Sequence, residues 1–233
     1  MKKNAERTFF FMVFCAIINE TTQKNQVMPM VRKTTKELLA DSFKELAETK
    51  PINKITIANI TDNCGMTQPT FYRYYKDKYD LIAWIYVTDS EKIMGQIGSN
   101  GYIWKDTLLD AARYFSENRA FALNALRHTS GRDAFLNLLE TVNTELLSAE
   151  VRKVLMTEKL PDDILTMIKV YCYGTVRFTF EWLIDNMPLS HADYAETLER
   201  CLPEPLRPYL YPQQNAREGK MASRETIAFA NSL

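Results

Sequence analysis

The segment ITIANITDNCGMTQPTFYRYYKDKYDLI, residues 55–82, holds the pattern that decides the fold. Thr56 precedes the periodic run IANITDNC, and its hydroxyl can accept hydrogen bonds from the free amides at a helix start. Gly65 ends this helix, because glycine adopts the left-handed conformation of a tight exit without steric penalty. Thr67 can then cap a short helix with Pro69 in its first turn, where a missing amide hydrogen costs nothing. Together these signals predict a helix-turn-helix.

Helical periodicity continues on both sides of this segment. Upstream, apolar residues recur at helical spacing from Val31 to Thr49, and Pro51 stops the pattern. Downstream we expect helices at residues 80–95, 104–118, 119–128, 131–148, 162–186 and 190–202. The sequence shows no strand pair, internal repeat or low-complexity run. We therefore expect an all-α fold.

The short helix after the glycine turn has two faces. Phe71 and Tyr75 lie four residues apart, which suits packing onto the two preceding helices. Gln68, Pro69 and Tyr72 are then left pointing outward, with Arg73 beside them. A helix of this length in the DNA major groove presents about four side chains to the bases, while flanking residues contact phosphates.

The outward side chains have the chemistry for that task. Gln68 can make a bidentate contact with adenine, and Pro69 can touch a thymine methyl group. Tyr72 and Tyr74 can donate hydroxyl hydrogens to phosphate oxygens, and Lys78 adds a cation. Alternatively, the capped helix pair is purely structural, and the Tyr74 ring only covers an edge of the domain. The run of aromatic residues after a capped proline favours binding to double-stranded DNA over these alternatives.

This segment resembles the DNA-binding domain of the TetR family of transcriptional regulators. The family signature runs from a threonine-capped helix through a glycine turn to an aromatic-Tyr pair, another aromatic residue and a lysine, and the resemblance covers residues 31–81. It implies recognition-helix roles for Gln68, Pro69, Thr70, Tyr72 and Tyr74, and phosphate contacts from Thr56 and Lys78. Tyr79 stands where many members have glutamate. The full set of expected DNA-binding residues is Thr56, Thr67, Gln68, Pro69, Thr70, Tyr72, Arg73, Tyr74 and Lys78.

The C-terminal part resembles the family less closely. Its stretch YCYGTVRFTFEWLIDNMPLSHADYAETL, residues 171–198, is similar to a subgroup that includes regulators of dihydroxyacetone kinase operons. In the family, the last two long helices pair with those of a second subunit. The apolar character of residues 164–184 suits such pairing, because a helix that is apolar on every side must be buried on every side. The resemblance thus implies a homodimer on a palindromic operator.

The same apolar helix supplies the residues expected to line an effector pocket: Tyr171, Arg177, Phe178 and Glu181. Arg177 lies in the middle of the helix, where a buried charge needs a partner. It can recognise an anion or form an internal ion pair with Glu181 or with a neighbouring helix, and the ion pair is favoured. The aromatic residues can line a cavity or form a core or dimer seam. The effector is expected to be a small molecule or, alternatively, a partner protein.

Composition and charge agree with this organisation. Net charge is zero, but residues 31–79 hold nine Lys and Arg against six Asp and Glu, whereas residues 80–233 hold sixteen against twenty-one. A basic module therefore precedes an acidic one. The expected domains are an N-terminal extension (1–29), a helix-turn-helix DNA-binding domain (30–79), an effector and dimerisation domain (80–211) and a polar tail (212–233).

The first residues resemble a signal peptide, because a cationic start precedes an apolar run at residues 9–18. That run is too short to span a bilayer and lacks an A-x-A exit. We interpret residues 1–29 as an upstream extension, with Met28 or Met30 as another possible start, and a membrane-associated leader stays open as the alternative. No other apolar run has bilayer length, so we expect a cytoplasmic protein.

Catalytic and metal-binding patterns are missing from the sequence. The cysteines have no CxxC spacing and the histidines are isolated, which argues against zinc; they are Cys15, Cys64, Cys172, Cys201, His128 and His191. No nucleophile-base pair or phosphate-binding glycine loop is found. We expect a non-enzymatic regulator without a cofactor. Whether it acts as a repressor or an activator depends on where its site lies relative to a promoter, which this sequence does not encode.

Overall fold

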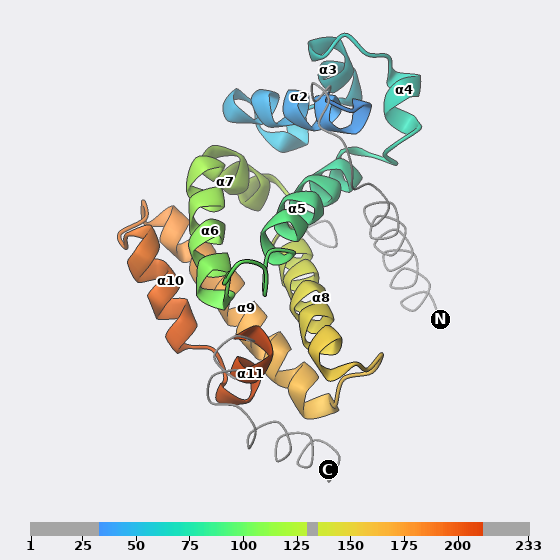
Figure 1. Ribbon diagram of the computed structural model, residues 1–233. Coiled ribbons are helices and arrows are strands. Elements are labelled where there is room, and N and C mark those ends of the chain that lie inside the picture. The colour runs from blue at the N-terminus through green and yellow to red at the C-terminus, as the bar shows by residue number, and fades with distance from the viewer. Residues whose placement is uncertain (1–32, 130–134, 212–233) are drawn as a thin grey trace. The chain divides into compact units, whose positions relative to one another are not determined.

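The computed structural model describes residues 33–129 and 135–211 (Figure 1). From Thr35 onward these residues belong to one compact unit. The predicted extension at residues 1–29 and the predicted tail at residues 212–233 lie outside the described residues.

Every regular element in the described ranges is a helix, which confirms the predicted all-α fold. No described helix has both the length and the apolar character needed to cross a membrane. The helices are α2 (Thr35–Thr49), η1 (Ile52–Lys54), α3 (Ile57–Asn63), α4 (Gln68–Tyr72), α5 (Lys78–Met94), α6 (Trp104–Glu117), α7 (Arg119–His128), α8 (Phe135–Leu155), α9 (Asp162–Ile184), α10 (His191–Arg200), η3 (Glu204–Leu206) and α11 (Arg207–Leu210).

The helix-turn-helix is built from α2, α3 and α4 as its caps predict. Thr56 Oγ1 accepts a hydrogen bond from the Asn59 amide at 3.1 Å, and the Asn59 side chain accepts one from the Thr56 amide at 3.2 Å. Gly65 has φ +68°, the left-handed conformation of the predicted exit. Thr67 Oγ1 then accepts from the Thr70 amide and begins α4. The local signals in residues 55–72 therefore agree with the structure.

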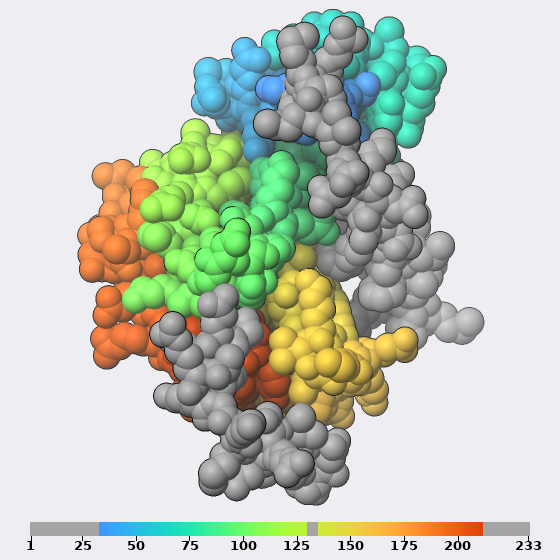
Figure 2. Space-filling view, in the orientation of Figure 1, coloured from blue at the N-terminus to red at the C-terminus, as the bar shows by residue number. Residues whose placement is uncertain are grey.

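The helices after α4 pack around a second core. Helices α8 and α9 run side by side in Figure 1, and α6 packs against α10. On the face shown in Figure 2, α5 lies between α6 and α8. The Phe135 ring lies edge-on to Phe121 and Phe180, with centroid distances of 6.3 and 5.9 Å. Edge-to-face contacts of this kind add to the stability gained from apolar burial.

Two helix boundaries differ from the sequence prediction. Helix α5 begins at Lys78, two residues early, because the Asp77 carboxylate accepts hydrogen bonds from the amides of Tyr79 and Asp80 at 2.9 Å. Helix α8 is described from Phe135 and runs to Leu155, beyond the expected end at residue 148. Its later part buries Val151, so tertiary packing extends the helix past the point where its periodic pattern weakens.

Candidate DNA-binding surface and effector pocket

Helix α4 buries one face and exposes the other. Phe71 is fully buried and Tyr75, just after the helix, is 3% exposed; their rings lie 5.6 Å apart. Burial raises the pKa of Tyr75, with the Asp80 carboxylate adding to the effect. These two rings hold α4 on the domain, as the spacing of four residues predicted.

The residues predicted to read DNA lie on the exposed side. Tyr72 is 57% exposed and Tyr74 is 41% exposed. Gln68 and Pro69, in the first turn of α4, are exposed as well. Thr67 and Arg73 are also exposed and Thr70 is half-buried, with its hydroxyl 2.9 Å from that of Thr67. Helix α4 and the residues just after it therefore present an amide, a proline ring and two phenols to the solvent.

Lys78, for which a phosphate contact is predicted, has hydrogen-bond partners within the protein. Its ammonium group donates hydrogen bonds to the backbone carbonyls of Ile52, Asn53 and Ile55 at 2.8, 3.2 and 2.9 Å. Burial lowers the pKa of Lys78, and the Asp77 carboxylate opposes this. Since an ammonium group has three hydrogens, these carbonyls use all of them. Lys78 thus fixes η1 and the entrance to α3, and its phosphate contact stays a prediction.

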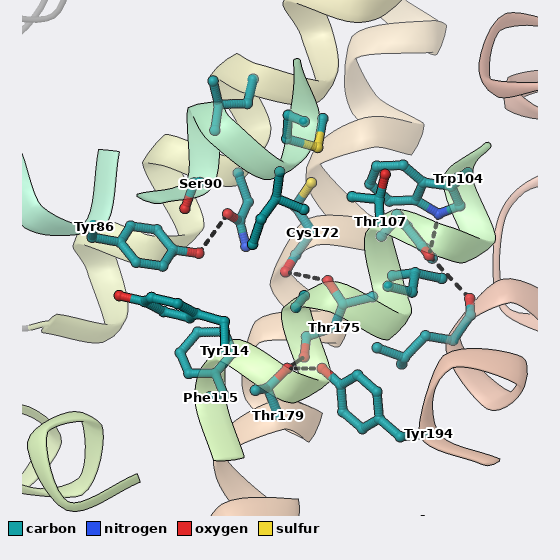
Figure 3. A pocket seen from close by; sticks show the side chains of 18 residues that line it. Tyr86, Ser90, Trp104, Thr107, Tyr114, Phe115, Cys172, Thr175, Thr179 and Tyr194 are labelled. Atoms are coloured by element: carbon teal, nitrogen blue, oxygen red, sulfur yellow. Dashed lines mark hydrogen bonds between the residues drawn. The ribbon is translucent and has the colours of Figure 1, made fainter. Parts of the chain in front are cut away.

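A pocket with a cavity volume of about 90 Å³ lies among α5, α6, α8, α9 and α10 (Figure 3). Of the four residues predicted to line an effector pocket, only Tyr171 does so. Phe178 is half-buried and stacks on the Tyr194 ring at 5.9 Å, outside the pocket lining.

The expected burial of Arg177 and Glu181 is wrong for the described chain. Both side chains are exposed, neither lines the pocket, and no ion pair between them occurs in the described residues. Helix α9 buries one stripe and turns the other outward, so the middle of an apolar helix is not buried all round. Val170 and Tyr173 on the outward stripe are 67% and 47% exposed.

Hydrogen bonds order the polar groups around the pocket. Trp104 Nε1 donates to the Tyr171 hydroxyl, which donates to the Leu198 carbonyl, both at 3.0 Å. The Tyr86 hydroxyl donates to Asn143 Oδ1 at 2.7 Å, drawn as a dashed line in Figure 3. Thr179 Oγ1 and the Tyr194 hydroxyl lie 2.6 Å apart. Most of the pocket's hydroxyl groups are therefore held in fixed directions.

The pocket carries no ionisable carboxylate, ammonium or guanidinium group in its lining. Burial raises the pKa of Tyr86 and Tyr171, raises that of Tyr194 to about 12, and raises that of the Cys172 thiol to about 12. The phenols and the thiol thus stay protonated at neutral pH. Within the described ranges no group of three His, Cys, Asp or Glu side chains could hold a metal ion.

Most pocket residues were missed by the sequence analysis, because they come from five helices. One signal was available. Thr107 stands between Trp104 and Leu108 on the core face of α6, and a polar residue on an apolar stripe is a candidate for a buried polar site. The contributions of Tyr86 on α5 and Asn143 on α8 carry no comparable signal.

Side chains on α6 and α7 contact the helix-turn-helix. Tyr114 on α6 lines the pocket, and Lys44 of α2 lies 5.8 Å from its ring centroid. The Lys44 ammonium pairs with the Asp89 carboxylate of α5 at 3.0 Å. Burial raises the pKa of Tyr114, and the nearby Asp89 carboxylate adds to this. A change at Tyr114 therefore reaches α2 through direct neighbours.

The second contact is a side-chain amide on α7. Asn124 Nδ2 donates to the carbonyls of Ala47 and Lys50 at 2.6 and 2.8 Å. Its Oδ1 accepts from the Ile52 amide at 3.0 Å. The turn after α2 is thus fixed to α7 by one residue that satisfies three backbone groups.

Similarity to known proteins agrees with both halves of this architecture. Residues 41–85 match the family model of bacterial regulatory proteins of the tetR family, and residues 103–204 match that of a transcriptional regulator C-terminal region. Over 87 residues the chain is 29% identical to the HTH-type dhaKLM operon transcriptional activator DhaS of Lactococcus lactis subsp. lactis (strain IL1403). The match spans 37% of this chain and 46% of that relative.

Solved structures share the fold at low sequence identity. The dihydroxyacetone kinase operon activator DhaS aligns with TM-score 0.55 and 20% identity, over 72% of this chain and 93% of that one. A TetR transcriptional regulator from Rhodococcus sp. RHA1 aligns with TM-score 0.52 and 16% identity, over 71% and 92%. The fatty acid degradation regulator FadR from Bacillus halodurans aligns with TM-score 0.50 and 14% identity, over 74% and 96%. With its helix-turn-helix at residues 41–85 and its helical C-terminal region, the chain belongs to the TetR family of transcriptional regulators.

Proposed function

We propose that this protein binds a palindromic DNA operator as a homodimer, and that a small molecule in the C-terminal pocket controls the binding. The observation that carries the proposal is the two-faced helix α4. Phe71 and Tyr75 fix it to the domain, while Gln68, Pro69 and Tyr72 stay exposed. Exposed polar and aromatic groups on a rigid short helix fit the major groove.

The individual roles follow from side-chain chemistry. Gln68 would read a base edge, Pro69 would contact a thymine methyl group, and the Tyr72 and Tyr74 hydroxyls would donate to phosphates. Lys78 would act indirectly, by holding the entrance to α3 in place. Thr56 is exposed at that entrance, so α3 can approach the backbone while α4 lies in the groove.

The outward stripe of α9 supports a homodimer. Val170, Tyr173 and Ile184 are large apolar residues, and between 47% and 67% of each is exposed in one chain. Apolar side chains gathered on one helix face are typical of a surface that a partner covers. Two recognition helices would then meet half-sites about one helical turn, roughly 34–36 Å, apart.

Control by an effector would act through α6 and α7. A ligand in the pocket touches Tyr114, whose ring neighbours Lys44 of α2. Asn124 transmits any shift of α7 to the turn after α2. A ligand that favours one of two arrangements shifts the population and so changes the spacing of the two recognition helices.

A protein partner that docks on the C-terminal domain stays the alternative controller. The presence of a pocket lined by fixed hydroxyls and apolar side chains favours the small molecule, because docking needs no internal cavity. As a transcriptional regulator, the protein is proposed to act in the cytoplasm and to have no enzymatic role.

Selection of bound sequences from random duplex DNA by the full chain tests the proposal. At low and high salt, we expect a palindrome whose recovery falls steeply with salt, because phosphate contacts release counterions. Sedimentation of the complex should show two chains per palindrome. Recovery of unrelated sequences with equal affinity would contradict the assignment of α4 as a reading helix.

A further inference from the structure

The strongest unexplained feature of the pocket is the Thr107 hydroxyl. Its oxygen is buried and makes no hydrogen bond within the described structure, and the residue is 4% exposed. Tyr102 lies close by, but its hydroxyl donates to Asp110 Oδ2 at 2.8 Å and forms no hydrogen bond of acceptable geometry with Thr107. Leaving a buried hydroxyl without a partner is costly, so Thr107 is suited to a hydrogen bond with a bound molecule.

A second polar group is available in the same lining. Asn143 accepts from Tyr86 through Oδ1, whereas its Nδ2 has no hydrogen-bond partner among the described residues. Thr107 lies on α6 and Asn143 on α8. The pocket therefore offers one free hydroxyl and one free amide nitrogen from different helices, among apolar neighbours such as Ile93, Leu108 and Leu146.

Charge and size narrow the class of ligand further. None of the residues that line the pocket carries a charge, so an ionic ligand would be buried without a counter-charge, which costs several kcal/mol. The cavity volume of about 90 Å³ is of the same order as the roughly 150 Å³ cavity that accommodates benzene. Compact molecules no larger than benzene are therefore favoured over acyl chains or nucleotides.

We propose that the pocket binds a small uncharged organic molecule that has a compact apolar body and a hydroxyl or carbonyl group, held by hydrogen bonds to Thr107 and Asn143. The proposal rests on the proposed control by an effector and names the chemistry of that effector. Anionic and cationic molecules are excluded by the absence of a charged partner in the lining.

Three probes of similar size test the class: cyclopentanol, cyclopentylamine as the cation and cyclobutanecarboxylate as the anion. Their affinities for the full chain are measured by ligand-detected NMR in the absence of DNA. We expect cyclopentanol to bind and each charged probe to bind at least about 100-fold more weakly. Equal or tighter binding of a charged probe, or no binding of cyclopentanol, would overturn the proposal.

Thr107→Val tests the contact itself. The substitution removes the hydroxyl and keeps the shape, so it should weaken cyclopentanol binding roughly 3- to 10-fold and leave cyclopentane binding unchanged. It should also raise the melting temperature of the free protein by about 2–4 °C, because an unsatisfied buried hydroxyl is removed. An unchanged cyclopentanol affinity would overturn the role of Thr107.

A cavity-filling variant gives an independent check. Ala111→Leu places a larger side chain in the lining and should abolish cyclopentanol binding, whereas Ala192→Leu at an exposed position of α10 should not. Operator affinity is measured separately with and without cyclopentanol. If the probe binds and operator affinity stays unchanged, control by an effector is refuted and the proposed ligand class stands. If the chain selects no operator sequence but still binds the probe, only the assignment of α4 as a reading helix is refuted.

Discussion

The two functional regions of this molecule are built in opposite ways. The proposed DNA-reading surface comes from α4 and the residues around it, Thr67 to Tyr74, with side chains that are mostly exposed. The pocket takes its side chains from five helices, at positions between residues 86 and 198. A surface made by consecutive residues is visible in the sequence, whereas a cavity exists only where distant helices meet. Substitutions in α4 and substitutions in the helices of the C-terminal part can therefore test this difference between the two regions.

The largest expected effect comes from Phe71, the fully buried ring under α4. Phe71→Ala should destabilise the DNA-binding domain by about 3–5 kcal/mol, because it removes a large apolar side chain and leaves a cavity. Chemical denaturation followed by circular dichroism measures the loss. A destabilisation under about 1 kcal/mol would mean that α4 is held mainly by other residues.

The exposed residues of α4 should affect binding without affecting stability. Gln68→Ala is expected to weaken operator binding by about 1–3 kcal/mol and to relax preference at one base position, because it removes a bidentate contact. Operator affinity is measured by fluorescence anisotropy with matched and mismatched duplexes.

Gln96→Ala serves as the matched control for that measurement. Gln96 is an exposed glutamine just after α5 that does not line the pocket, and its change should leave operator affinity and base preference unaltered. If Gln68→Ala weakens binding equally for all sequences, Gln68 contacts the backbone and does not read a base.

A substitution of Lys78 tests whether this lysine, which is expected from the family resemblance to contact a phosphate, stabilises the fold instead. Lys78→Met removes three hydrogen bonds to backbone carbonyls and should lower the free energy of unfolding by about 1–3 kcal/mol. The salt slope of operator binding should stay unchanged, because the ammonium group is already used within the protein.

Lys76→Met is the control substitution for Lys78→Met, because Lys76 is an exposed lysine two residues earlier in the sequence. A fall in the salt slope of about one on Lys78→Met would instead show a direct phosphate contact. That result would restore the role expected from the family resemblance.

The smallest effect is expected at Arg177, which the sequence placed in the pocket and the structure places on the exposed face of α9. Arg177→Ala should leave cyclopentanol affinity unchanged, because the Arg177 side chain does not line the pocket. Ligand-detected NMR measures the affinity. A tenfold change in ligand affinity would bring Arg177 back to the pocket.

The sequence by itself determined the helix-turn-helix. Threonine caps, a glycine in the left-handed region and a proline in the first turn are local signals that act within a few residues, so Thr56, Gly65 and Thr67 could be assigned before any packing was known. The spacing of Phe71 and Tyr75 then decided which side of α4 is buried. The all-α fold followed from periodicity, which is likewise a property of neighbouring residues.

Only the tertiary structure decided what the side chains of Lys78, Arg177, Thr107 and Asn143 contact. Lys78 is occupied because the carbonyls of η1 come within reach of its ammonium group, more than twenty residues away along the chain. Arg177 is exposed because α9 packs through its other face, which a uniformly apolar sequence does not specify. Thr107 and Asn143 share a pocket because α6 and α8 meet around it. Such groups depend on long-range packing, whereas caps and turns are encoded within a few adjacent residues.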